Sequence, residues 1–256
     1  MKTYLIDLDG TMYRGTKIIP EAKVFLDYLL ANELPFLFLT NNAKRTKQQN
    51  VEHMEKMGYT GIKPEHFFTS SMATARYVAK RFAGRRAQYV GQDGLKEALL
   101  DEGFTIVDDR VDFVFVGLDT SGDYMKYSGV LKHLLNGARL IGTNSDRLLA
   151  QADGFSIGNG SIVAMFEYAC GQVSPKIGKP YQPILEECLE KYHLQKQDVI
   201  MVGDNLETDI KLGSDGGVET VFVTSGVHSE ADVEKLQIYP DHTVTSLCEL
   251  IEMGIQ

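Results

Sequence analysis

Short apolar runs alternate with amphipathic stretches along most of the chain. Residues 4–6, 36–39 and 199–202 are unbroken apolar runs, the pattern of strands that are buried on both faces of a sheet. Between such runs, apolar residues recur at helical spacing, as in residues 20–30. Because strands that alternate with helices build parallel sheets, the pattern predicts an α/β fold with a mainly parallel sheet.

The same pattern predicts the other elements and a break in their order. The alternation restarts near Gly84, and a middle block of roughly one hundred residues, a usual domain size, has strands and helices of its own. We therefore predict one core domain that is split in sequence, residues 1–82 and 179–256, with a second α/β domain, residues 83–178, inserted into it. The further predicted strands are 67–69, 88–90, 111–118, 139–141 and 219–224, and the further helices are 47–57, 73–81, 94–100, 124–135, 161–170, 181–192 and one that starts at 208.

Composition and charge argue against several classes of function. The formal net charge of -9 is unfavourable for binding nucleic acid, which needs clustered lysine and arginine. Charged residues interrupt every apolar run before it could span a membrane, and the N-terminal strand ends in aspartates, unlike a signal peptide. The three cysteines are odd in number and widely spaced, which indicates reduced thiols and a cytoplasmic protein. We expect no nucleic-acid or membrane partner, and the sequence leaves open whether the chain forms a homo-oligomer.

Polar motifs stand at strand ends outside the middle block. Asp7-Leu8-Asp9-Gly10-Thr11 follows the first strand, so it carries two carboxylates into the crevice where α/β sheets bind ligands. Three further motifs follow: Thr-Asn-Asn at 40–42, Gly-Lys-Pro at 178–180, and Gly-Asp-Asn at 203–205 with Thr-Asp at 208–209. Each motif alone is typical of a turn, a helix cap or a surface lysine, but the four together are specific.

The four motifs, in this order and at these strand ends, resemble the haloacid dehalogenase superfamily of phosphotransferases. The large insertion between the second and third motifs resembles the C2-type cap of the branch that is NagD-like and 4-nitrophenylphosphatase-like. The resemblance covers the whole chain and implies a Rossmann-like parallel-sheet core with an inserted α/β cap domain. It also favours phosphoryl chemistry, since the dehalogenases of the superfamily lack the second aspartate, which is Asp9 here.

The resemblance implies a role for each motif residue. Asp7 would be the nucleophile that forms an aspartyl phosphate, and Asp9 would be the general acid and then the base that activates water. Asp9 would also ligate the metal through its backbone carbonyl. Thr40 and the backbone of Asn41 would hydrogen-bond the phosphoryl oxygens.

A phosphate monoester is nearly a dianion, so a carboxylate nucleophile needs cations beside it. Asp7 and Asp204, at adjacent strand ends, form a hard oxygen site that suits Mg²⁺, and Lys179 supplies a second positive charge. By the same resemblance, Asn205 and Asp209 would orient the metal ligands from an outer shell.

One loop of the middle block resembles the Thr-Asn-Pro-Asp stretch that lines the substrate side of this branch's cap. Here the residues are Thr143, Asn144, Ser145 and Asp146, so a serine replaces the usual proline. The resemblance implies that Thr143, Asn144 and Asp146 contact the substrate.

The function that we expect is Mg²⁺-dependent hydrolysis of small phosphomonoesters, with nucleoside monophosphates, sugar phosphates and pyridoxal phosphate as substrate classes. One alternative is a phosphotransferase or mutase, although such members carry their cap between the first two motifs, where this chain has only a helix and a strand. A receiver-like domain with an acceptor aspartate would have neither the insertion nor Asp9. Another alternative is a protein that binds phosphometabolites without turnover, although both Asp7 and Asp9 are retained.

Overall fold

The computed structural model describes residues 2–151 and 154–254. Contacts within the chain group it into two compact units. The first unit consists of Met1–Thr40, Gln48–Phe68 and Cys188–Gln256, and the second of Asn41–Lys47 and Thr69–Glu187. Each unit contains one parallel sheet, as the alternating pattern predicts. The predicted domain limits, at 82/83 and 178/179, stay a prediction.

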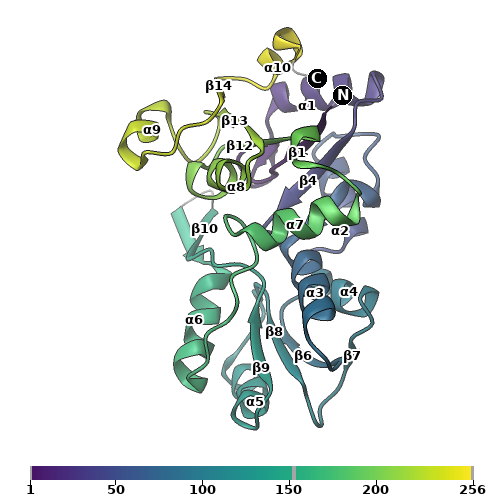
Figure 1. The fold of residues 1–256 in the computed structure, drawn as a ribbon, viewed down its shortest axis with the longest axis vertical. Helices are drawn as coiled ribbons and strands as arrows, with labels where there is room; N and C mark the ends of the chain where they lie inside the picture. Colours follow the sequence, from purple (N-terminus) through teal and green to yellow (C-terminus); the bar gives the residue numbers. More distant parts are fainter. Residues whose placement is uncertain (1, 152–153, 255–256) are drawn as a thin grey trace. The chain divides into compact units, whose positions relative to one another are not determined.

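A six-stranded parallel sheet forms the centre of the first unit (Figure 1). The first strand lies in its middle, with Tyr4 in register with Ile200 on one side and with Phe36 on the other. The strands in spatial order are β14 (His242–Val244), β13 (Glu219–Val223), β12 (Val199–Gly203), β1 (Thr3–Ile6), β4 (Phe36–Thr40) and β5 (Phe67–Thr69). The chain leaves β1 for β4 and returns later on the other side at β12, so the order reverses at β1, where such sheets bind ligands.

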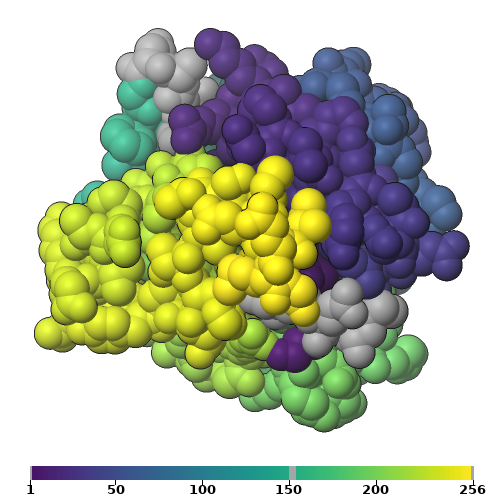
Figure 2. Space-filling model, turned by 90° about the horizontal axis from the view of Figure 1, so that it is seen from above, coloured from purple at the N-terminus to yellow at the C-terminus, as the bar shows by residue number. Residues whose placement is uncertain are grey.

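The strands of this sheet are short and apolar because helices cover them. Every residue of β1, β4 and β12 is buried. On α1 (Pro20–Ala31) the buried residues are Ala22, Phe25, Leu26 and Leu29, one apolar face at helical spacing. The C-terminal helix packs on α1, and the yellow C-terminal segment borders the purple N-terminal one in Figure 2. The other helices of this unit are α2 (Lys47–Lys56), α8 (Lys211–Gly216), α9 (Glu230–Leu236) and α10 (Cys248–Met253).

A small hairpin that the sequence pattern did not predict follows the first motif. Its strands are β2 (Tyr13–Arg14) and β3 (Lys17–Ile18), and Arg14 is in register with Lys17. Gly15 takes a positive φ of 62° in the turn between them, a conformation that glycine adopts without strain.

The second unit contains a separate four-stranded parallel sheet, in the order β7 (Thr105–Ile106), β6 (Arg86–Val90), β8 (Phe113–Val116) and β9 (Arg139–Gly142). Val90, Val114, Leu140 and Phe166 belong to its buried core. The unit also has the hairpin β10 (Leu148–Gln151) and β11 (Gly154–Ile157), and the helices α3 (Ser70–Arg81), α4 (Asp93–Asp101), α5 (Tyr124–Leu135) and α6 (Asn159–Cys170); α7 (Gln182–Lys191) follows the third motif.

Strand β8 is shorter than the predicted strand 111–118. Directly before Phe113, the Asp112 carboxylate accepts hydrogen bonds from the backbone N–H groups of Arg85 and Arg86 at 3.0 and 2.9 Å, and the Asp112 backbone N–H donates to the Arg86 backbone oxygen at 2.8 Å. None of the helices in residues 2–151 and 154–254 is long and apolar enough to cross a membrane.

Candidate active site

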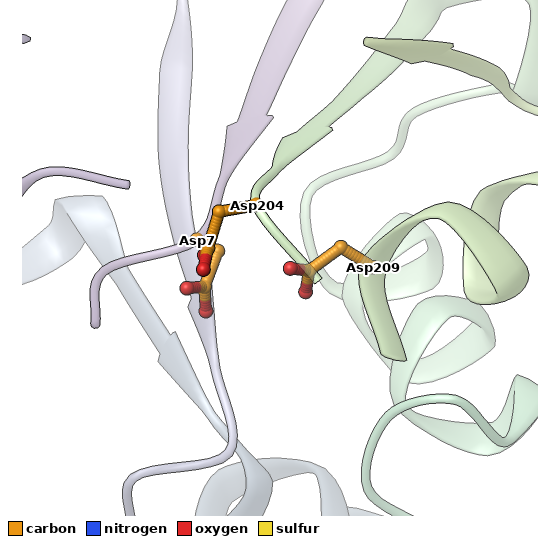
Figure 3. Close-up of side chains that lie close together, drawn as sticks. All are labelled: Asp7, Asp204 and Asp209. Atoms are coloured by element: carbon orange, nitrogen blue, oxygen red, sulfur yellow. The ribbon is translucent and has the colours of Figure 1, made fainter. Parts of the chain in front are cut away.

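Three aspartates meet at the carboxyl edge of the six-stranded sheet. Asp7 follows β1, Asp204 follows β12, and Asp209 lies in the π-helical turn Leu206–Ile210. Carboxylate oxygens of the three lie within 4.8 Å of one another, and all three residues are buried. Figure 3 shows Asp7 and Asp204 next to each other, with the carboxylate of Asp209 directed toward them. Parallel strands explain the meeting of Asp7 and Asp204, because their carboxyl ends share one edge.

Both oxygens of the Asp204 carboxylate accept hydrogen bonds. The Thr11 hydroxyl donates to Oδ1 at 3.0 Å, and the Val227 backbone N–H donates to Oδ2 at 2.7 Å. Burial, followed by the negative charge of Asp7, raises the pKa of Asp204 to about 6. A neighbouring cation would reverse this effect, since it favours the charged carboxylate.

Glycines allow the loops to close on this carboxylate. A Cβ on Gly10 or on Gly226 would overlap the side chain of Asp204, and Gly10 also has a positive φ of 102°. Only glycine therefore fits at these positions without displacement of Asp204.

Asp209 lies in the carboxylate cluster itself. Its carboxylate accepts a hydrogen bond from the backbone N–H of Asn205 at 3.2 Å and packs against the backbone of Gly203. The Asn205 side chain accepts from the backbone N–H of Glu207 at 3.0 Å, so it caps the turn that carries Asp209.

The other predicted residues of the first unit lie on the same edge. Asp9, two residues after Asp7, is exposed and forms an isolated bridge with Tyr13 of the hairpin. Thr40 is the last residue of β4, the neighbour of β1, and is buried.

The predicted residues of the second unit form a connected group. The Asn41 Nδ2 group donates to Asp146 Oδ1 and to the backbone oxygen of Lys179, both at 3.0 Å. The backbone N–H of Lys179 donates in turn to Asn41 Oδ1 at 2.8 Å, and Asn144 Nδ2 donates to the Asn41 backbone oxygen at 2.8 Å. Two distant motifs and the loop at 143–146 therefore share one hydrogen-bond network.

This network includes a residue for which the sequence predicts no role. Asn159, the first residue of α6, is buried, and its Nδ2 group donates to Thr143 Oγ1 and to the backbone oxygen of Val116, both at 3.1 Å. In the first unit, Thr11 and Val227 were missed in the same way. Thr11 belongs to the first motif and could have been found there. Val227 acts through its backbone N–H, and the identity of a residue does not show which backbone groups bind a side chain.

Two family models match the chain. A haloacid dehalogenase-like hydrolase model matches residues 4–105, and a HAD-hydrolase-like model matches residues 176–250. An acid sugar phosphatase of Staphylococcus epidermidis is 38% identical over 247 residues, which cover 96% of this chain and 95% of the relative. The structure of NagD from Escherichia coli K-12 is 33% identical, with a TM-score of 0.88 and coverage of 97% and 98%. A 4-nitrophenylphosphatase structure from Thermotoga maritima is 30% identical, with a TM-score of 0.90 and coverage of 98% and 97%.

The relative at 38% identity covers nearly the whole chain, and the two family models match both of its ends, so the chain belongs to the haloacid dehalogenase-like hydrolases. Within them it is a phosphatase of the NagD-like and p-nitrophenylphosphatase-like kind, and its two parallel sheets are those of the core and of a C2-type cap. The predictions of family, fold class and enzyme class are confirmed.

The family implies a divalent metal ion, and the cluster of Asp7, Asp204 and Asp209 could bind it. Carboxylate oxygens are the ligands that hard cations prefer. Three buried carboxylates this close repel one another, and a cation would relieve both the repulsion and the cost of burial. The donor set therefore fits a hard divalent ion.

Proposed function

We propose that this phosphatase hydrolyses small phosphomonoesters in a Mg²⁺-dependent reaction that passes through an aspartyl phosphate on Asp7. The observation that carries the proposal is the buried cluster of Asp7, Asp204 and Asp209 at the carboxyl edge of the core sheet. Asp7 and Asp9 stand in the motif of the family's nucleophile and general acid, and the chain retains both.

The first half-reaction transfers the phosphoryl group to the protein. An Asp7 oxygen attacks phosphorus, the bond from phosphorus to the ester oxygen breaks, and Asp9 gives its proton to the leaving oxygen. In the second half-reaction Asp9 takes a proton from water, whose oxygen attacks the phosphorus of the acyl phosphate. The bond between phosphorus and the Asp7 oxygen breaks, inorganic phosphate leaves, and both aspartates regain their starting states.

Asp7 and Asp204 would hold Mg²⁺ through side-chain oxygens, and Asp9 through its backbone carbonyl. Asp209, which reaches the cluster, and Asn205, which caps its turn, would orient these ligands. When bound, the ion neutralises the charge that builds up on the phosphoryl oxygens and on Asp7.

The remaining roles follow the family resemblance. Thr40 and the backbone of Asn41 would donate hydrogen bonds to the phosphoryl group, and Lys179 would supply a positive charge to it. We also propose that residues 83–178 are the inserted cap domain, with Thr143, Asn144 and Asp146 on its substrate-contacting loop. The hydrogen bonds that join Asn41 to Asp146 and Asn144 support a common function for these segments.

Among the three expected substrate classes, we favour sugar phosphates. The relatives at 38–40% identity are acid sugar phosphatases, and a small phosphorylated metabolite is then the partner of the protein. Cys170, Cys188 and Cys248 are free thiols, and we keep a cytoplasmic location as part of the proposal.

A phosphate-release assay tests the proposal. p-Nitrophenyl phosphate and a panel of sugar phosphates, nucleoside monophosphates and pyridoxal phosphate are incubated with and without Mg²⁺, with Asp7→Asn in parallel. We expect Mg²⁺-dependent release that the variant loses while it keeps its far-UV circular dichroism, with sugar phosphates ranked first. Release by Asp7→Asn at the rate of the wild type would remove Asp7 as the nucleophile.

A further inference from the structure

The first unit contains a pocket of about 500 Å³ outside the carboxylate cluster. It lies between the hairpin β2–β3, the start of α1 and the loops that follow β13 and β14. Asp7, Asp204 and Asp209 do not line it. Its volume is within the usual range for sites that bind small molecules.

Two cations stand side by side at this pocket. Arg14 and Lys17 both line it, and they are directly opposite each other in the register of the hairpin. Like charges in opposite positions of a hairpin repel each other. Both side chains are exposed, and within residues 2–151 and 154–254 neither forms an ion pair or a hydrogen bond, so water alone screens the pair. An anion between them would remove the repulsion.

The start of α1 adds a favourable field at the same pocket. Ile19, Pro20 and Glu21 line it, and the N-cap residue Ile19 has no side chain that could cap the helix. Pro20 has no N–H group and the N–H of Ala22 donates to the Ile19 backbone oxygen at 3.1 Å, so the contribution of this 12-residue helix to anion binding is its dipole rather than a row of donors. The Glu21 carboxylate opposes the two cations, so the three side chains leave one positive charge in excess.

The remaining wall combines hydroxyl groups with apolar surface. The Ser246 hydroxyl accepts a hydrogen bond from the backbone N–H of Cys248 at 3.2 Å, which leaves its proton for a ligand, and Thr224 lines the pocket as well. Ile18, Val223 and Leu247 supply apolar surface. This wall suits a ligand with a carbon skeleton, and the volume is larger than a phosphate ion needs.

We propose that this pocket binds the phosphate group of a small metabolite at a site separate from the catalytic carboxylates. Arg14 and Lys17 bind the phosphate oxygens, the α1 N-terminus faces the same charge, and the apolar wall holds the rest of the molecule. Two residues that line the pocket form hydrogen bonds to the carboxylate cluster or to the loop beside it. Thr11 lines the pocket and donates to Asp204, and Ser225 lines it and donates to the backbone oxygen of Gly10 at 3.0 Å.

Backbone amide NMR on the ¹⁵N-labelled protein tests this site without turnover, because a chelator removes divalent metal. Inorganic phosphate and glucose 6-phosphate are titrated separately. We expect saturable shifts at residues 14–21, 224–225 and 245–246, with glucose 6-phosphate bound more tightly than inorganic phosphate. Equal affinity of the two ligands would contradict a metabolite site and leave a site for the free ion, and absence of saturable shifts at these residues would overturn the proposal.

Charge variants give the control. Arg14→Gln combined with Lys17→Gln should weaken binding at least about tenfold, since charge-assisted hydrogen bonds are the strong ones. Glu21→Gln should strengthen binding, an effect in the opposite direction that general damage to the fold would not produce. Lys56→Gln combined with Lys196→Gln removes the same charge from exposed positions of the same unit and should leave the affinity unchanged. Equal weakening by both double variants would mean that net charge, and not this pocket, determines binding.

Discussion

Asp204 is the residue at which burial and charge oppose each other most clearly. It is fully buried beside Asp7, and its pKa is raised, yet Thr11 and Val227 donate hydrogen bonds that favour its charged form. In the metal-free protein the balance of these effects raises the pKa of Asp204, and a divalent cation nearby would lower it.

The pH dependence of stability follows from this balance. The folded pKa of this carboxyl group is about 6, against 3.8 for an ordinary aspartate, so its contribution to stability is fully present below pH 3.8 and is lost as the pH rises to about 6. Without metal, urea unfolding should therefore show that the stability of wild type relative to Asp204→Asn falls between pH 4 and about 6. A difference that stays constant over this range would contradict the raised pKa.

Close approach of Gly226 to Asp204 makes a second prediction. Gly226→Ala places a methyl group where the Asp204 carboxylate lies, so it should cost about 1–3 kcal/mol in unfolding free energy and weaken the metal site. Gly129→Ala is the matched control, because its Cβ would meet no atom within 4 Å in helix α5, and it should stabilise by up to about 1 kcal/mol. Urea unfolding and a Mg²⁺ titration check both variants. Equal changes in unfolding free energy and in Mg²⁺ affinity would contradict the close contact between Gly226 and Asp204.

Among the elements, helix α3 and the part of α7 that belongs to the second unit are joined by a buried charge. Glu187 is 1% exposed, and its carboxylate accepts from Arg81 at 2.7 Å and from Lys80 at 3.2 Å, with Arg76 at 3.7 Å. Each cation is partly exposed to water, but the buried carboxylate depends on the cations to compensate its charge.

Removal of that carboxylate should therefore be costly. Glu187→Gln leaves three cations close together, and we expect a loss of about 3 kcal/mol in unfolding free energy. Glu186→Gln, in the neighbouring exposed position, should change it by less than about 0.5 kcal/mol. Chemical denaturation of both variants provides the comparison. A similarly small effect of both substitutions would contradict a stabilising role of the ion pairs that Glu187 forms.

Elements with a strong apolar pattern were predictable from the sequence, and those without one were not. The pattern predicts β1, β4 and β12 because their residues are apolar without interruption, and α5 because its apolar face repeats at helical spacing. The hairpin β2–β3 has only two residues in each strand, two of them charged, so it has no periodicity to detect. Strand β14, a short edge strand, was missed for a related reason.

The site was predictable to the same extent. Asp7 and Asp204 follow neighbouring buried strands, so the parallel sheet brings them together. The approach of Asp209 depends on a π-helical turn that Asn205 caps, and local turn geometry of this kind does not follow from residue spacing. The hydrogen bond from Val227 to Asp204 comes from a backbone N–H group. Because every residue except proline has such a group, the sequence does not indicate this contact.

At the scale of the whole molecule, the cluster predicts that metal and stability are linked. An ion that binds only the folded state stabilises it by about 2.7 kcal/mol at one hundred times its dissociation constant. Mg²⁺ should therefore raise the melting temperature of the wild type at pH 7 and leave that of Asp204→Ala nearly unchanged. Calorimetry with Mg²⁺ and with chelator provides the comparison, and an equal shift in both proteins would place the metal elsewhere.

The central claim is that the phosphoryl group passes through Asp7. The most direct test is acid quenching of Asp9→Asn during incubation with Mg²⁺ and a substrate that the wild type hydrolyses, followed by peptide mass spectrometry. This variant lacks the base that activates water, so a phosphoryl group should accumulate on the peptide that contains Asp7, and Asp7→Asn should show none. Hydrolysis by the wild type with no phosphorylated Asp7 in the quenched variant, or with the phosphoryl group on another residue, would contradict the account.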